Sequence, residues 1–230
     1  PNNSKMTKFF EKLSNDYIFV MSYMSNGSLN DYLSNNFKDV TWKMKLDFLR
    51  DIVIGIKWIH KNKIVHRDIH DGNILIGNLK WYGPDSRTSI ADLGFSWPAN
   101  DDLDRMIMWE LTTGCRPFCD RAYDSYLALD ICAKMFRPNI TKDTPQCWAI
   151  LMQKCWHSNP LKRPTIDEIY DEVNSAYWDE NKCYIKEAEN KRQELLSAGK
   201  FLVKYMHPHS KTHSKLLNPT IDSMLLDLFQ

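Results

Sequence analysis

The sequence lacks long apolar runs and any large excess of charge, and each absence excludes a class of protein. No segment approaches the roughly 18 consecutive apolar residues of a membrane-spanning helix. The polar, charged start of the chain does not resemble a secretory signal peptide. Thirty Lys and Arg against 29 Asp and Glu give a net charge of +1, which argues against a surface built mainly for nucleic acid. We therefore expect no nucleic-acid partner, no membrane association and an intracellular, cytoplasmic location.

The sequence also contains no C-x-x-C pair among its six cysteines. Because no export signal is visible, we expect all six to be reduced thiols. Cys115 and Cys119 lie four residues apart, and a zinc or disulfide role for them is the less favoured alternative. The spacing of His207, His209 and His213 could suggest a metal site, but a polar linker is favoured because no regular element holds the three imidazoles.

Apolar residues are nevertheless plentiful, at 43% of 230 residues, which is enough for one packed domain with an extension. Apolar positions spaced three and four apart predict a long helix from Thr41 to about His60. Four tryptophans, Trp42, Trp58, Trp109 and Trp156, are expected in the core. The expected fold is mainly α with a few short strands. Further helices are expected at 29–37, 106–114, 126–136, 147–156 and 166–173, and strands at 17–24, 64–65, 74–76 and 89–91.

The residues with the clearest chemical meaning stand in loops between the short strands. Residues 66–73 (HRDIHDGN) separate two of these strands, and residues 92–94 (DLG) follow a third. A carboxylate at Asp68, an amide at Asn73 and a second carboxylate at Asp92 can converge on one point when strand ends hold them. Such a group suits phosphoryl transfer, which requires an oriented hydroxyl and bound Mg²⁺.

This part of the sequence resembles the eukaryotic protein kinases, and most closely the tyrosine-kinase-like group. The kinase motif H-R-D-x-x-x-x-N is matched by residues 66–73, and D-F-G by residues 92–94 with Leu in place of Phe. The likeness covers about residues 15–175. VMSYMSNGSLNDYL is similar to the hinge and first helix of the large lobe, MIMWELTTGCRPF to its central helix, and CWHSNPLKRPT to its end.

The resemblance implies roles for the residues of these two motifs. Asp68 would accept or orient the proton of a substrate hydroxyl, and Asn73 and Asp92 would hold Mg²⁺. Arg67 would be structural, placed to meet a phosphate on the activation loop. His70 occupies the position of a phosphate-binding Lys in serine/threonine kinases, and a His is cationic only part of the time near neutral pH.

The resemblance also implies an ATP site beside these residues. Met21 would be the gatekeeper behind the adenine, and Ser22 and Met24 would offer backbone groups of the hinge to it. Leu75 would form part of the pocket floor. ATP and Mg²⁺ are thus the expected cofactors, and a protein substrate or protein partner is the expected macromolecular ligand.

Two parts of the kinase pattern are absent from the sequence. The residues before Met21 contain no Gly and no strand like V-A-I-K, so the small lobe is expected to be absent. No A-P-E motif follows Gly94. Arg163 resembles the Arg that pairs with the Glu of that motif. Since a buried, unpaired Arg would cost several kcal/mol, Arg163 is expected to be exposed or paired with another acid.

These observations lead to a division of the chain and to two hypotheses for its function. We expect a lead-in at 1–16, a partial kinase domain at 17–175, and a charged helical extension with a polar tail at 176–230. The first hypothesis is ATP-dependent phosphoryl transfer to Ser/Thr or Tyr hydroxyls of proteins, by a parent protein of which this chain, starting at Pro1, is a fragment. The truncated chain alone is expected to be incompetent. The alternative is an inactive, pseudokinase-like module that binds or scaffolds partners. Substrate and oligomeric state stay open.

Overall fold

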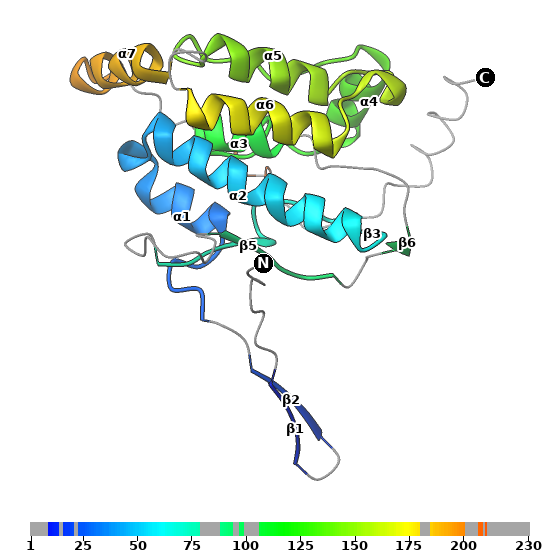
Figure 1. Cartoon of the computed structure of the whole chain (residues 1–230). Helices are drawn as coiled ribbons and strands as arrows, with labels where there is room; N and C mark the ends of the chain where they lie inside the picture. Colours follow the sequence, from blue (N-terminus) through cyan, green and yellow to red (C-terminus); the bar gives the residue numbers. More distant parts are fainter. Residues whose placement is uncertain are drawn as a thin grey trace.

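The computed structural model describes residues 23–78, 88–93, 106–179, 185–200, 207–208 and 210, except the side chain of Cys132, together with the backbone of 9–13, 16–20 and 97–98. This part of the chain is mostly helical with three short pairs of strands, as the sequence predicted (Figure 1). None of its helices has both the length and the apolar character needed to cross a membrane.

Seven helices make up about half of the described residues. They are α1 (Leu29–Asn36), α2 (Trp42–Lys61), α3 (Ile107–Thr113), α4 (Ser125–Ala133), α5 (Gln146–Cys155), α6 (Ile166–Trp178) and α7 (Ile185–Ser197), with 3-10 turns η1 (Phe37–Asp39) and η2 (Pro160–Lys162). Capping residues decide where several of them begin. Ser28 and Thr165 both form capping boxes, with Asp31 and Glu168 respectively, and Thr41 accepts a hydrogen bond from the Met44 amide.

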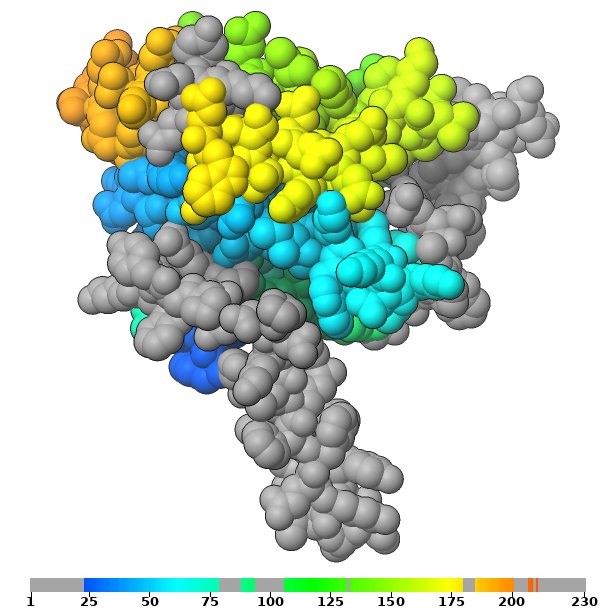
Figure 2. Space-filling model, viewed as in Figure 1, coloured from blue at the N-terminus to red at the C-terminus, as the bar shows by residue number. Residues whose placement is uncertain are grey.

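Helix α2 is the central element of the fold. It packs against α6 on one side and against β5 on another, and Figure 2 shows the surfaces of α2 and α6 meeting along one face. Its predicted inward positions are all buried, which follows from their helical spacing. They are Trp42, Leu46, Leu49, Ile52, Val53, Ile56 and Ile59.

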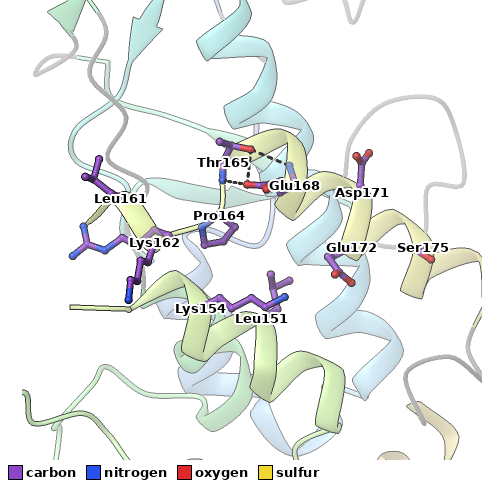
Figure 3. Close-up of a pocket in the computed structure, with 11 residues that line it drawn as sticks. Leu151, Lys154, Leu161, Lys162, Pro164, Thr165, Glu168, Asp171, Glu172 and Ser175 are labelled. Carbon is purple, nitrogen blue, oxygen red and sulfur yellow. Dashed lines mark hydrogen bonds between the residues drawn. The ribbon is translucent and has the colours of Figure 1, made fainter. Parts of the chain in front are cut away.

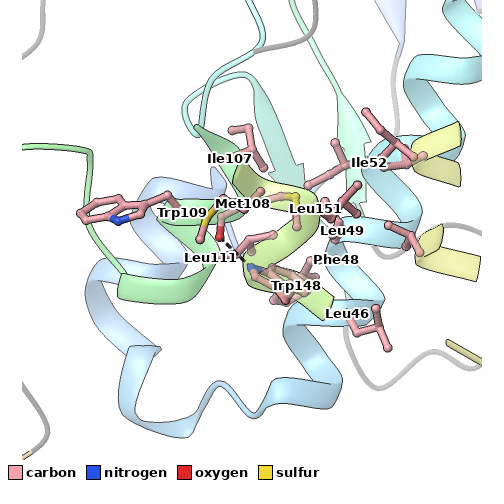
Figure 4. Close-up of a cluster of buried hydrophobic side chains, with 14 of the residues drawn as sticks. Leu46, Phe48, Leu49, Ile52, Ile107, Met108, Trp109, Leu111, Trp148 and Leu151 are labelled. Atoms are coloured by element: carbon pink, nitrogen blue, oxygen red, sulfur yellow. Dashed lines mark hydrogen bonds between the residues drawn. The ribbon is translucent and has the colours of Figure 1, made fainter. Parts of the chain in front are cut away.

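The core beside α2 is built from side chains of α3 and α5 (Figure 4). The rings of Trp42 and Trp148 meet edge to face with centroids 5.5 Å apart. The indole N–H of Trp148 donates to the Thr112 hydroxyl at 2.9 Å, so this aromatic side chain is buried without leaving its polar atom unsatisfied. Helix α2 also contacts β3 and β5, which flank the loop residues described below.

The strands form three antiparallel pairs. They are β1 (Phe9–Leu13) with β2 (Asp16–Val20), β3 (Ile64–Val65) with β6 (Trp97–Pro98), and β4 (Ile74–Ile76) with β5 (Thr88–Ile90). Three of the predicted strands, at 64–65, 74–76 and 89–91, are therefore found within one residue of their expected limits. The strand expected at 17–24 is found as β2 at Asp16–Val20, and its partner β1 lies in the segment that was expected to be a lead-in.

Three expectations from the sequence were wrong. Trp58 is 59% exposed, although Trp42, Trp109 and Trp156 are buried as expected. The charged stretch from Asp179 to Arg192 was expected to be a solvated helix face, but Arg192 is only 2% exposed. Cys147 takes part in a disulfide, so the six cysteines are not all thiols.

Helix α7 is held by an ion pair between buried Arg192 and partly exposed Glu189, which the sequence did not predict. Arg192 donates from Nε and Nη2 to the carboxylate of Glu189, and from Nη1 to the carbonyl of Lys38 at 2.8 Å. Glu189 also accepts from the backbone N–H of Trp42 at 2.9 Å. Burial alone would raise the pKa of Glu189, but these hydrogen bonds outweigh it and lower that pKa. The extension thus docks on η1 and the start of α2.

Candidate active site

The loop between β3 and β4 is tied to the end of β5 by His66. This side chain is 1% exposed, and its Nε2 donates to the carbonyl of Ala91 at 2.8 Å. Its Nδ1 accepts from the backbone N–H of Asp68 at 3.3 Å. Because both ring nitrogens are used, His66 fixes the start of the loop against the strand that precedes Asp92.

Asp68 and Asn73 lie in direct contact at the two ends of this turn. The side-chain amide of Asn73 donates to the Asp68 carbonyl at 2.9 Å and to its carboxylate Oδ2 at 3.3 Å. The Asn73 backbone N–H donates to the His70 carbonyl at 2.9 Å, which closes the turn. Since the amide nitrogen is occupied, the oxygen of Asn73 is the atom left to serve as a metal ligand.

Asp92 is positioned through its neighbour Ala91. The N–H of Ala91 donates to the Asn73 carbonyl at 2.8 Å, while its C=O accepts from His66. The backbone immediately before Asp92 therefore touches both ends of the loop. Asp92 is exposed and has a φ of +61°, and Arg67 has a φ of +67°. Left-handed backbone costs about 1–2 kcal/mol per non-glycine residue, so both predicted motifs contain a strained residue.

His70 lies beside Asp68 with a defined ring orientation. Its Nδ1 accepts from the backbone N–H of Gly72 at 3.0 Å. The proton of the neutral ring is therefore on Nε2, which is 3.8 Å from Oδ2 of Asp68. A Cβ on Gly72 would come within 2.8 Å of the His70 ring, so a glycine is needed at that position for the ring to lie here.

An ion pair that the sequence did not suggest holds the middle of the loop. Arg116 donates to both carboxylate oxygens of Asp71, with N–O distances of 2.9 to 3.1 Å. Asp71 is 3% exposed, and its carbonyl accepts from the N–H of Asn30 in α1. Burial alone would lower the pKa of Arg116, but the hydrogen bonds to Asp71 outweigh it and raise that pKa. The 45-residue separation left no local signal for this pair.

The residues predicted to contact adenine are described only in part. Leu75 is half-buried in β4 and forms an isolated bridge with Ser28. Met24 is half-buried at the start of the turn that leads to Ser28. These two predicted residues thus belong to neighbouring segments. Met21 and Ser22 lie outside the described residues.

The chemistry of the donors fits Mg²⁺. A carboxylate at Asp92 and an amide oxygen at Asn73 are oxygen ligands, and Mg²⁺ is usually held by one or two such groups together with water and substrate phosphates. Among the described residues, no group of three or more His, Cys, Asp or Glu side chains is arranged to hold a metal ion. His209 and His213, considered above with His207, lie outside those residues.

A groove of about 780 Å³ lies elsewhere, where α5, η2 and the start of α6 meet (Figure 3). Basic side chains of Lys154 and Lys162 and acidic side chains of Glu168 and Glu172 line it, and none of the predicted site residues does. Arg163 also lines the groove, where it is half-buried and donates to the carbonyl of His157 at 2.7 Å. Arg163 was expected to be exposed or paired with an acid. It is half-buried instead, and a backbone carbonyl accepts one of its hydrogen bonds.

Comparison with known protein families gives a match over most of the chain. The family model described as protein tyrosine and serine/threonine kinase matches residues 4–107 and 105–173. These ranges include the loop at 66–73 and Asp92.

Individual relatives agree with this match. A protein of Acanthamoeba polyphaga mimivirus assigned by name as a serine/threonine-protein kinase/receptor (R826) is 32% identical over 181 residues, covering 65% of this chain and 10% of the relative. Roco11 of Dictyostelium discoideum, assigned by name as a serine/threonine-protein kinase, is 25% identical and covers 82% of this chain and 15% of the relative. The serine/threonine-protein kinase STY17 of Arabidopsis thaliana is 27% identical, covering 67% and 31% respectively. The chain thus spans a third or less of each of these relatives.

Proposed function

The chain belongs to the protein tyrosine and serine/threonine kinase family, and we propose that residues 66–73 and Asp92 form the phosphoryl-transfer centre of an ATP-dependent protein kinase. The observation that carries the proposal is the contact of Asn73 with Asp68, together with the Ala91 backbone that joins this loop to Asp92. The names of the relatives favour Ser/Thr hydroxyls of proteins over Tyr hydroxyls as acceptors.

Each residue has a distinct role in this proposal. The carboxylate of Asp68 orients the acceptor hydroxyl and takes its proton as the oxygen attacks. The oxygens of Asn73 and Asp92 would hold Mg²⁺, which would neutralise phosphate charge. The Nε2–H of His70, next to Asp68, is a donor available to a phosphate oxygen. Met24 and Leu75, with Met21 and Ser22, border the adenine.

We also propose that the domain is the large lobe of a kinase of the tyrosine-kinase-like group, over residues 17–175, and acts in the cytoplasm. The mainly helical described part and the order of the motifs support the assignment to the large lobe. Ahead of Met21 the 230 residues contain no Gly-rich phosphate loop, and none of the lysines there, including Lys12 in β1, stands in a sequence like V-A-I-K. Losing a single preorganised donor of this kind costs about 10²–10³ in rate. We therefore expect the isolated polypeptide to bind Mg²⁺–ATP without useful turnover.

The test combines nucleotide binding with phosphotransfer on the full 230-residue chain. With ATP at 100 times its Kd, Mg²⁺-dependent binding should stabilise the fold by about 2.7 kcal/mol in a thermal-shift assay. Asp92→Asn should remove the Mg²⁺-dependent part of that shift. Asp171→Asn, an equal charge change at an exposed position of α6, should leave it intact.

The outcomes separate the two parts of the proposal. A nucleotide shift that is independent of Mg²⁺ and of Asp92 would refute the assigned centre. Phosphotransfer that is abolished by Asp68→Asn would support the centre and refute the expectation that the isolated chain is inactive.

A further inference from the structure

Two sulfur atoms lie in contact beside the residue that holds the catalytic loop. Cys115 and Cys119 flank Arg116 in the loop that follows α3. The Sγ–H of Cys119 donates to Sγ of Cys115 across 2.9 Å, and neither residue is part of a disulfide. A disulfide bond is about 2.05 Å long, so the two sulfur atoms need to approach by less than about 1 Å to form one.

The surrounding backbone keeps the two cysteines together. The N–H of Cys119 donates to the Arg116 carbonyl at 3.1 Å, which closes a turn between them. The Tyr123 hydroxyl donates to the Pro117 carbonyl at 2.7 Å, and the N–H of His207 donates to the Cys119 carbonyl at 2.7 Å. These bonds hold the turn from both sides, so the short distance between the sulfur atoms belongs to a fixed arrangement.

The two thiols differ in their access to solvent. Cys115 is half-buried, whereas Cys119 has no exposed surface. A small oxidant therefore meets Cys115 first, and Cys119 is the thiol placed to react with the product. Thiolate character and access to solvent decide which cysteine reacts first, and here the two sulfur atoms differ in access.

We propose that Cys115 and Cys119 form a peroxide-sensitive thiol pair whose oxidation to a disulfide loosens the hold of Arg116 on Asp71. In the first step the Cys115 sulfur attacks one oxygen of hydrogen peroxide, the O–O bond breaks, and Cys115 sulfenic acid and water result. The Cys119 sulfur then attacks the Cys115 sulfur, the S–O bond breaks, and a second water leaves. In total two thiols and one peroxide give one disulfide and two waters.

A disulfide between Cys115 and Cys119 would close a ring that contains Arg116. This is how oxidation would affect the candidate catalytic loop. The Arg116 guanidinium makes three hydrogen bonds to Asp71, all between 2.9 and 3.1 Å, and such a bidentate arrangement tolerates little displacement. Drawing the two sulfur atoms together moves the backbone on either side of Arg116. Any consequence for phosphoryl transfer rests on the proposed function, whereas the disulfide and its effect on the loop do not.

The first experiment maps the bond. The reduced full chain is treated with hydrogen peroxide, remaining thiols are alkylated, and the peptide covering 106–121 is analysed by mass spectrometry. We expect that peptide to escape alkylation at both cysteines, to lose about 2 Da for the two hydrogens removed, and to recover both thiols after dithiothreitol. Cys155, which is buried, should stay alkylatable after denaturation and serves as the internal control.

Two variants test the order of the steps. In Cys119→Ser the sulfenic acid on Cys115 has no thiol to react with, so dimedone should label Cys115. In Cys115→Ser the buried Cys119 should stay reduced. Independent oxidation of the two residues, with no linked peptide in the wild-type chain, would overturn the proposal.

The second experiment follows the loop by hydrogen–deuterium exchange. Amides in 66–73 should exchange at least about twofold faster in the oxidised chain than in the reduced chain. Peroxide should leave their exchange unchanged in Cys119→Ser. A linked peptide with unchanged exchange at 66–73 would refute the transmission. Neither readout uses phosphotransfer, so a chain without kinase activity can still support or overturn the proposal.

Discussion

Arg116, in the loop after α3, and Asp71, in the middle of the candidate catalytic loop, form a bidentate ion pair across 45 residues of sequence. The carboxylate side chain is 4% exposed and the guanidinium side chain 25% exposed. The pair connects the helical core to the short turn in which Asp68 and Asn73 meet. It is therefore the most direct structural support of the candidate active site.

Breaking this pair should be costly. Asp71→Asn or Arg116→Gln leaves one buried charge without its partner, and we expect each to lower the free energy of unfolding by about 3 kcal/mol. The double variant should cost much less than the sum of the two single changes, because neither charge then remains. Urea unfolding of the four proteins measures this coupling.

An exposed ion pair provides the matched control. Lys57 and Asp167 join α2 to α6 with an N–O distance of 2.7 Å, and their side chains are 40% and 69% exposed. Lys57→Gln should leave the unfolding midpoint close to that of the wild type. Additive effects of Asp71→Asn and Arg116→Gln would contradict the structural role given to their pair.

Lys45 should make stability depend on pH in the alkaline range. Its side chain has no exposed surface, donates to the Thr112 carbonyl at 3.0 Å and lies over the Trp42 ring. Its pKa is lowered from 10.5 to about 7, mainly by burial and also by the charge of Arg192, while Asp143 and Glu189 oppose the change. Between these two values the unfolded chain holds a proton that the folded chain has lost, so stability rises with pH.

The measurement compares the wild type with Lys45→Met by urea unfolding from pH 7 to pH 10. The difference in unfolding free energy should change in favour of the wild type by up to about 1.4 kcal/mol per pH unit. Other titrating groups are common to both proteins and cancel. A difference that does not vary with pH would mean that Lys45 keeps its usual pKa in the fold.

Two glycines have the same left-handed backbone conformation, so comparing their Ala variants separates the cost of backbone strain from the cost of a steric clash. Gly114 ends α3 with a φ of +72°, and a Cβ there would come within 2.4 Å of the Phe37 ring. Gly199 has a φ of +63° and open space around it. Both Ala variants incur the cost of left-handed backbone, about 1 kcal/mol, but Gly114→Ala must also displace an aromatic ring. We expect the Tm of Gly114→Ala to fall several degrees further, and equal Tm values would argue against the packing of Phe37 on this turn.

Gly72→Ala should move His70 and leave His66 in place. The added methyl group would lie within 2.8 Å of the His70 ring, while the hydrogen bonds of His66 to Ala91 and Asp68 are not touched. In NMR spectra the ring protons of His70 should shift and those of His66 should not. Unchanged His70 signals would show that the ring is not held against Gly72.

Local patterns in the sequence were sufficient for much of the secondary structure. The spacing of apolar residues predicted α2 and its buried face, because a helix repeats every 3.6 residues whatever surrounds it. The helix expected from position 166 does begin there as α6, and its capping box of Thr165 and Glu168 involves only residues within one turn. The order H-R-D-x-x-x-x-N and D-x-G indicated the family from residues that are close in the chain.

Only the tertiary structure determines which charged side chains are buried and which sulfur atoms are in contact. Arg116 reaches Asp71, and the Glu189–Arg192 pair docks α7 on α2, across 45 and 147 residues of sequence. Trp58 is exposed although it lies on α2, because burial depends on what packs against each face. A hydrogen bond or ion pair between distant segments depends on the final positions of both backbones. The residue pattern of one segment therefore cannot predict where the other segment will lie.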